Sequence, residues 1–160
     1  MTKTIAAFAL TVLVHCIAVA RPRADNPVTL IVASLDTVYA NRGDTVLVRV
    51  PLRITPGYHV NANPASSEDY IPLSVRFDSS SDVHALKPEY PKGESHRMEE
   101  LDETLLVYDQ GVTIPVPVVV GKEIESGLHT LKGTVEFQAC DDRVCFMPDE
   151  RHFSAVISVK

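Results

Sequence analysis

Two cysteines near the C-terminus are the residues of this sequence best suited to chemistry. Cys140 and Cys145 are separated by the four residues Asp141-Asp142-Arg143-Val144. If these four form the turn of a hairpin, the cysteines face each other with Cα atoms ~4.5 to 5.5 Å apart, a separation that a disulfide bridges. Spacing alone leaves two interpretations open. The pair is either a structural disulfide or a redox dithiol, in which one thiolate attacks a partner disulfide and the other thiol resolves the mixed disulfide.

The N-terminus indicates the compartment in which these cysteines act. A positive start at Lys3, an almost wholly apolar run over residues 5–14 and the small residues Ala18 and Ala20 predict a secretory signal peptide over residues 1–20. Cys16 leaves with this segment, so an even pair remains where disulfides persist. We therefore expect a periplasmic protein with no membrane insertion after cleavage. A lipoprotein acylated at Cys16 is an alternative, which His15 disfavours because a small residue is needed there.

Composition limits the remaining possibilities. The chain has 160 residues, of which 45% are hydrophobic and 22% charged, as expected for one globular domain. With 15 Lys plus Arg against 21 Asp plus Glu, the net charge of −6 provides no field that would attract nucleic acid. We expect no nucleic-acid partner.

The elements that position the cysteines are predicted to be strands. Short β-branched runs separated by turn residues predict an all-β sandwich in one domain over residues 25–160, with no helix of convincing length. Pro115 and Pro117 lack the N–H of a central ladder, which predicts an edge strand there. The expected strands are Val28 to Ser34, Thr45 to Ile54, Ile71 to Asp78, Val83 to Leu86, Leu105 to Tyr108, Val112 to Val120, Leu128 to Ala139 and Phe153 to Val159.

Metal binding is a competing class of function. Cys145, Met147 and His152 offer the thiolate, thioether and imidazole that copper prefers, but a blue-copper loop has its histidine before its methionine, and here the order is reversed. The histidines at positions 59, 84, 96, 129 and 152 show no short paired spacing and are interpreted as ordinary surface or strand residues. We expect no metal and no cofactor. Hydrolase and dinucleotide fingerprints are absent.

Several segments together resemble a known family. These are Pro56 to Asn61, Ile71 to Leu73, Tyr90 to Gly93, Val107-Tyr108 with Ile114 to Val116, and Gln138 to Pro148. They resemble the N-terminal periplasmic domain of the thiol:disulfide interchange protein DsbD over nearly all of the predicted mature chain. The resemblance implies an immunoglobulin-like antiparallel β-sandwich, whose cysteine pair accepts electrons and reduces periplasmic disulfides.

The resemblance also implies roles for individual residues. Cys145 matches the cysteine that forms mixed disulfides with partners, and Cys140 matches the resolving cysteine. A cap loop that shields the pair falls on Glu99, Glu100 and Leu101, where leucine replaces the family's aromatic residue. The tyrosines that form the wall of the family's site correspond to His59 and Asn61. The four-residue spacing between the cysteines is one shorter than in the best-known members.

The resulting expectation is a periplasmic thiol:disulfide exchange relay. Because the sequence ends at Lys160 directly after its last expected strand, we expect a separate membrane electron donor, and thioredoxin-like or other disulfide-bearing proteins as clients. Any catalytic activity would be that of a thiol:disulfide oxidoreductase. The alternative is a non-catalytic secreted binding module with a structural disulfide, and a copper-handling protein is less favoured.

Overall fold

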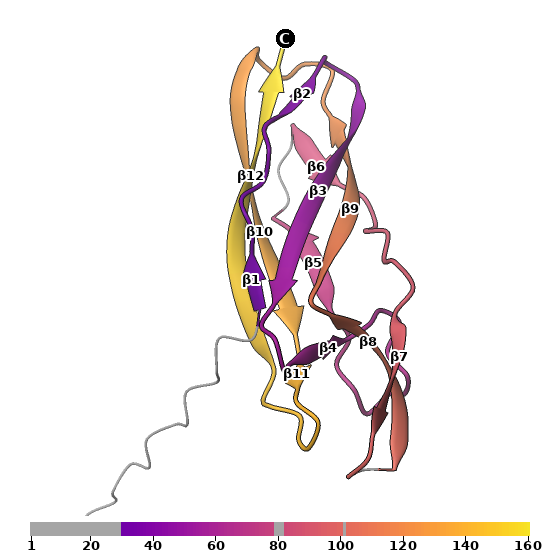
Figure 1. Ribbon diagram of the computed structural model, residues 1–160. Helices are drawn as coiled ribbons and strands as arrows, with labels where there is room; N and C mark the ends of the chain where they lie inside the picture. The colour runs from indigo at the N-terminus through magenta and orange to yellow at the C-terminus, as the bar shows by residue number, and fades with distance from the viewer. Residues whose placement is uncertain (1–29, 79–81, 101) are drawn as a thin grey trace, which may run out of the picture.

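The computed structural model describes residues 30–78, 82–100 and 102–160, which form three four-stranded sheets (Figure 1). The predicted signal peptide lies outside the described residues. Within those ranges, no helix is long and apolar enough to cross a membrane. The strands are β1 (Leu30–Val32), β2 (Val38–Ala40), β3 (Thr45–Ile54), β4 (His59–Asn61), β5 (Ser74–Phe77), β6 (Val83–Ala85), β7 (Glu94–Met98), β8 (Glu103–Asp109), β9 (Gly111–Val120), β10 (Gly127–Phe137), β11 (Ala139–Cys140) and β12 (Asp149–Val159).

Two of the sheets form a sandwich. Their strand orders are β1-β3-β9-β6 and β2-β12-β10-β5, and every pairing is antiparallel except the parallel pair β2 and β12. The third sheet, β11-β4-β8-β7, lies at one end of the sandwich, where Figure 1 also shows the loop that joins β11 to β12. The all-β sandwich predicted from the sequence is confirmed.

Alternation along β3 shows why these residues form a sandwich strand. Val48, Val50 and Leu52 are at most 3% exposed, whereas Arg49 and Arg53 between and beside them face solvent. Period-two alternation places all the apolar side chains of a strand on one face, which here meets the opposite sheet. The strand predicted over Thr45 to Ile54 has the bounds that the structure gives.

The prediction of an edge strand at Pro115 and Pro117 is wrong. β9 lies inside its sheet, between β3 and β6. The carbonyls of Pro117 and Pro115 accept hydrogen bonds from Leu86 N and Glu89 N, in the segment that follows β6. The N–H and C=O of one strand residue point to the same side of the strand. The positions where these prolines lack an N–H therefore also point toward this segment, and no hydrogen bond between β9 and β3 is lost.

Three strand runs of the sandwich continue into the end sheet. β3 leads to β4 through a turn at Thr55–Gly57, β8 leads into β9 through Gln110, and β10 leads to β11 through Gln138. At the second crossing, Gln110 has a φ of 60° and a Cβ on Gly111 would lie 2.7 Å from the Leu52 carbonyl oxygen. Glycine is therefore required where this strand bends. Three crossings fix the end sheet to the sandwich.

Candidate functional site

The pairing register places the site residues on one face of the end sheet. Cys140 lies directly opposite His59 on β4, and His59 lies opposite Asp109 on β8. Further out, His96 on β7 lies opposite Leu105 on β8. Residues directly opposite each other in a ladder project to the same face, and so do residues two apart along a strand. The other face, which carries Ala139 and Val60, contributes to the sandwich core.

Cys140 and Cys145 form a disulfide at the end of this sheet. Their Cα atoms are 3.9 Å apart, closer than the range expected from hairpin geometry, and the two residues form an isolated antiparallel bridge. Cys140 is completely buried, whereas Cys145 is partly exposed. Of the two cysteines, only Cys145 is accessible to solvent.

Asp141 closes the turn between the cysteines. Its Oδ1 accepts hydrogen bonds from the backbone N–H groups of Arg143 and Val144, each at 2.8 Å, and its own N–H donates to Val144 O at 3.0 Å. These backbone donors lower the pKa of the Asp141 carboxyl, because they stabilise its charged form. The turn thus has a fixed shape of its own besides the disulfide.

Asn61 holds the other side of the cysteine loop. It is 1% exposed, and its Nδ2 donates to Gln138 Oε1 at 3.4 Å and to Ile71 O at 3.3 Å. Gln138 in turn donates from Nε2 to Phe146 O at 3.2 Å. The predicted wall residue Asn61 is therefore connected through Gln138 to the residue that follows Cys145.

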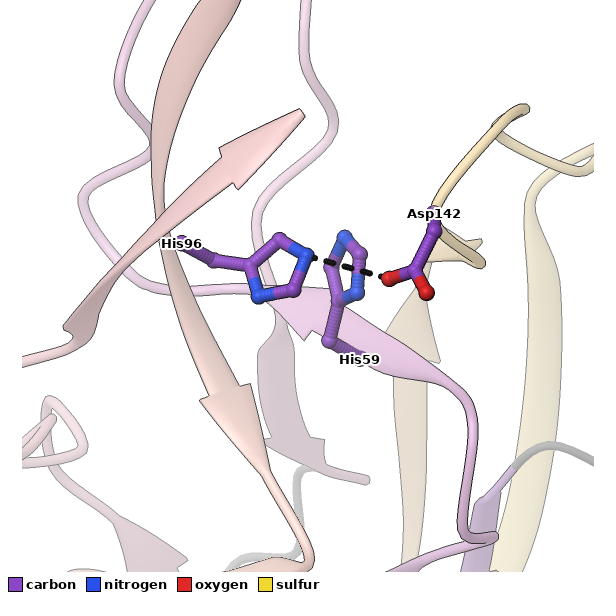
Figure 2. A group of neighbouring side chains, drawn as sticks. All are labelled: His59, His96 and Asp142. Carbon is purple, nitrogen blue, oxygen red and sulfur yellow. Dashed lines mark ion pairs between the residues drawn. The ribbon is translucent and has the colours of Figure 1, made fainter. Parts of the chain in front are cut away.

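His59, the second predicted wall residue, packs against a histidine from another strand (Figure 2). Its ring lies 4.3 Å from the ring of His96, centroid to centroid, and His96 Nε2 lies 3.4 Å from Asp142 Oδ1. His59 is 3% exposed, and burial lowers the pKa of its imidazole, with His96 acting in the same direction. Asp142, Asp109 and Asp141 oppose this shift. The ring is therefore neutral at neutral pH.

The predicted cap residues Glu99 and Glu100 form the turn of the β7–β8 hairpin. They line one surface depression together with Arg97 and with Asp142 and Arg143 of the cysteine turn. Leu101, expected to shield the sulfurs, lies outside the described residues.

An apolar cluster beneath this turn contains the buried cysteine. Cys140 is buried together with Met98, Leu105 and Val107, and Cys145 packs against the cluster from its edge. Met98 is 0% exposed and immediately precedes Glu99. Apolar cover of the disulfide thus comes from β7 and β8.

Sequence reasoning missed Met98 and His96. Met98 follows the alternation of β7, whose residues Glu94, His96 and Met98 point to the site face, but the polar character of this segment concealed the strand. His59 and His96 contact each other but are far apart in the sequence, so no short spacing of histidines indicated the contact. Of the copper ligands that the sequence analysis disfavoured, Cys145 is bonded to Cys140, and His152 Nδ1 lies 3.2 Å from Thr134 Oγ1.

Comparisons with known proteins identify the family of this chain. A family model described as the N-terminal part of the thiol:disulfide interchange protein DsbD matches residues 29–157. The N-terminal periplasmic domain of ScsB from Proteus mirabilis has a similar fold, with a TM-score of 0.51 and 15% identity over 71% of this chain. The match spans 42% of the ScsB chain.

A second solved structure is the reduced N-terminal domain of DsbD from Neisseria meningitidis. It is 22% identical, with a TM-score of 0.42, and the match covers 72% of this chain and 77% of that chain. No curated protein matches this sequence. The family model covers most of the chain, and the immunoglobulin-like sandwich inferred from the resemblance is confirmed. This chain belongs to the family of DsbD N-terminal domains.

Proposed function

We propose that this protein is a periplasmic thiol:disulfide exchange domain that passes two electrons to partner disulfides through Cys140 and Cys145. The observation that carries the proposal is the unequal burial of the two cysteines. Cys140 is completely buried on the sheet, while Cys145 lies partly exposed beyond the turn. A relay needs one sulfur that partners reach and one that attacks only from within.

The exchange proceeds in two balanced steps. In the reduced protein, the Cys145 thiolate attacks one sulfur of a partner disulfide, which forms a mixed disulfide and releases the other partner sulfur as a thiolate. Cys140 then attacks the Cys145 sulfur, which reforms the intramolecular disulfide and releases the second partner thiolate. The partner gains two electrons and, after protonation, two thiols. A membrane electron donor would restore the dithiol by the reverse sequence.

The surroundings of Cys145 support docking of a protein partner. Val144 and Met147, which flank this cysteine, are 53% and 68% exposed. Exposed apolar side chains beside a reactive sulfur provide contact area for the surface of another protein. Thioredoxin-like proteins and other disulfide-bearing periplasmic proteins are the proposed clients.

Trapping experiments test the assignment of roles. Cys140→Ala should accumulate a mixed disulfide with an oxidised thioredoxin-like protein, because no thiol remains to resolve it. Cys145→Ala should accumulate little, because the remaining thiol is buried. Equal trapping by both variants would contradict the assignment.

The reduction potential separates the relay from a structural disulfide. An exchanging pair should equilibrate with glutathione or dithiothreitol at a potential above about −300 mV, whereas structural disulfides lie below it. If the pair resists reduction, or if reduction unfolds the domain, the protein is instead a binding module with a structural disulfide.

A further inference from the structure

We propose that His59, His96 and Asp142 form a binding site for a divalent transition-metal ion, with Zn²⁺ as its representative. The site uses two imidazole nitrogens and one carboxylate oxygen from three separate segments of the chain: β4, β7 and the turn between the cysteines. It does not use the cysteines themselves. The inference therefore goes beyond the proposed function.

The positions of the three side chains support this site. One ligand atom from each residue lies within 4.8 Å of the other two, and His96 Nε2 is already 3.4 Å from Asp142 Oδ1. Tetrahedral zinc with bonds of ~2.0 to 2.1 Å holds its ligand atoms roughly 3.3 Å apart. Asp142 has a side chain 86% exposed on a turn, so small movements of this carboxylate close the remaining distance.

Two histidine nitrogens lack the partners that buried polar atoms normally have. The Nε2 atoms of His59 and His96 are inaccessible to solvent and accept or donate no hydrogen bond within the described structure. For His96, the nearby Asp142 oxygen makes an ion-pair contact without hydrogen-bond geometry. Burying an unpaired polar atom is costly, and most such atoms in folded proteins are satisfied. A bound cation would satisfy both nitrogens.

The surrounding pocket fits an ion in size and charge. His59, His96 and Asp142 line a pocket of about 110 Å³ together with Asp109 and Tyr58. Pockets for organic ligands measure roughly 300 to 1,000 Å³, so this one suits an ion and a few waters. Asp109 and Asp142 supply two negative charges that offset a divalent cation, while the two imidazoles supply nitrogen ligands of the kind that zinc and similar metals prefer. Three protein ligands leave a further position for water.

Titration of the oxidised protein with Zn²⁺ tests the site directly. Isothermal titration calorimetry on the purified protein, with the disulfide intact and free thiols shown to be absent, should find one Zn²⁺ per chain. His96→Gln and Asp142→Ala should each weaken binding at least tenfold. His129→Gln is the matched control, because His129 contacts Glu125 O on the sandwich and lies outside the cluster; its affinity should equal that of the wild type.

His59→Gln is a weaker test because its buried position risks misfolding, so the tests rest on the half-buried His96 and the exposed Asp142. Nuclear magnetic resonance gives an independent readout: Zn²⁺ should shift the ring signals of two histidines and leave those of the control histidine in place. Absence of stoichiometric binding, or equal binding by wild type and His96→Gln, would overturn the proposal. Because the oxidised protein is used, neither result bears on thiol exchange, and a failed exchange assay would leave this site intact.

Discussion

Replacing Met98 with alanine should loosen the hairpin that covers the disulfide. Met98 is 0% exposed and belongs to the apolar cluster that contains Cys140. Truncation of a fully buried methionine costs about 2 to 5 kcal/mol through lost transfer free energy and the cavity left behind. We expect the free energy of unfolding to fall by about 3 kcal/mol. Met98→Leu, which nearly conserves volume, should lose less than about 1.5 kcal/mol.

The same change should speed the reaction of the disulfide with dithiothreitol. If the lost 3 kcal/mol acts locally on the β7–β8 hairpin, the population of the open hairpin rises roughly 150-fold. That factor is an upper limit on the acceleration, because Cys145 is partly exposed even when the hairpin is closed. We therefore expect dithiothreitol to reduce the disulfide of the folded Met98→Ala variant about tenfold faster than that of the wild type.

Urea unfolding of the oxidised protein and a stopped-flow reduction assay under native conditions measure the two effects. Ile157→Ala is the matched control: Ile157 is equally buried, but it lies on β12 in the sandwich, opposite His129. It should lose a similar free energy of unfolding and leave the reduction rate within about twofold of the wild type. If Ile157→Ala accelerates reduction as much as Met98→Ala, access to the disulfide is governed by global stability, and the argument for the hairpin fails.

Three further predictions concern the cap, the cysteine turn and a buried tyrosine. Replacing Glu99 and Glu100 with Gln should speed alkylation of the reduced protein about threefold, because nearby carboxylates raise the pKa of a thiol; an unchanged rate in low salt would count against an electrostatic cap. Asp141→Ala should lower the free energy of unfolding by about 1 kcal/mol, a loss similar to that of a helix cap. Asp141→Asn keeps a hydrogen-bond acceptor and should lower the free energy of unfolding by less. Equal losses for the two variants in urea titrations would contradict this. Burial raises the pKa of the Tyr108 phenol. The contribution of this group to stability is therefore complete below its unfolded pKa of about 10 and is lost as pH rises above it. Between about pH 8 and pH 10.5, Tyr108→Phe should lose less unfolding free energy than the wild type, and parallel losses would refute the assignment.

Local alternation and turn residues were sufficient to predict most of the sandwich. β3 has the predicted bounds, and β9, β10 and β12 overlap the strands predicted for them. In these strands, burial of one face on a large core makes the apolar pattern regular. The strands missed were β2, β4 and β7, which are short or polar. Such strands are specified by their neighbours in the sheet rather than by their own residues.

The site was predictable only where its members are close in sequence or match a family motif. The spacing of Cys140 and Cys145 identified them as a candidate pair, and the family resemblance identified Asn61 and His59 as site residues. The contact of His59 with His96 depends on the order β4-β8-β7, in which β8 separates the two histidine strands. No local pattern encodes that order. The same reason explains why Met98 was missed beside Cys140.

The division between sandwich and end sheet explains how the site can hold groups that are costly to bury. A main cluster of apolar residues from both sandwich sheets forms the larger core, while the cluster around Cys140 is small. Because three strand runs of the sandwich continue into the end sheet, the larger core stabilises the end sheet's position. The site face therefore need not be optimised for stability. Among the described residues, it retains a buried histidine without a hydrogen-bond partner at Nε2, directly opposite Cys140 in the ladder.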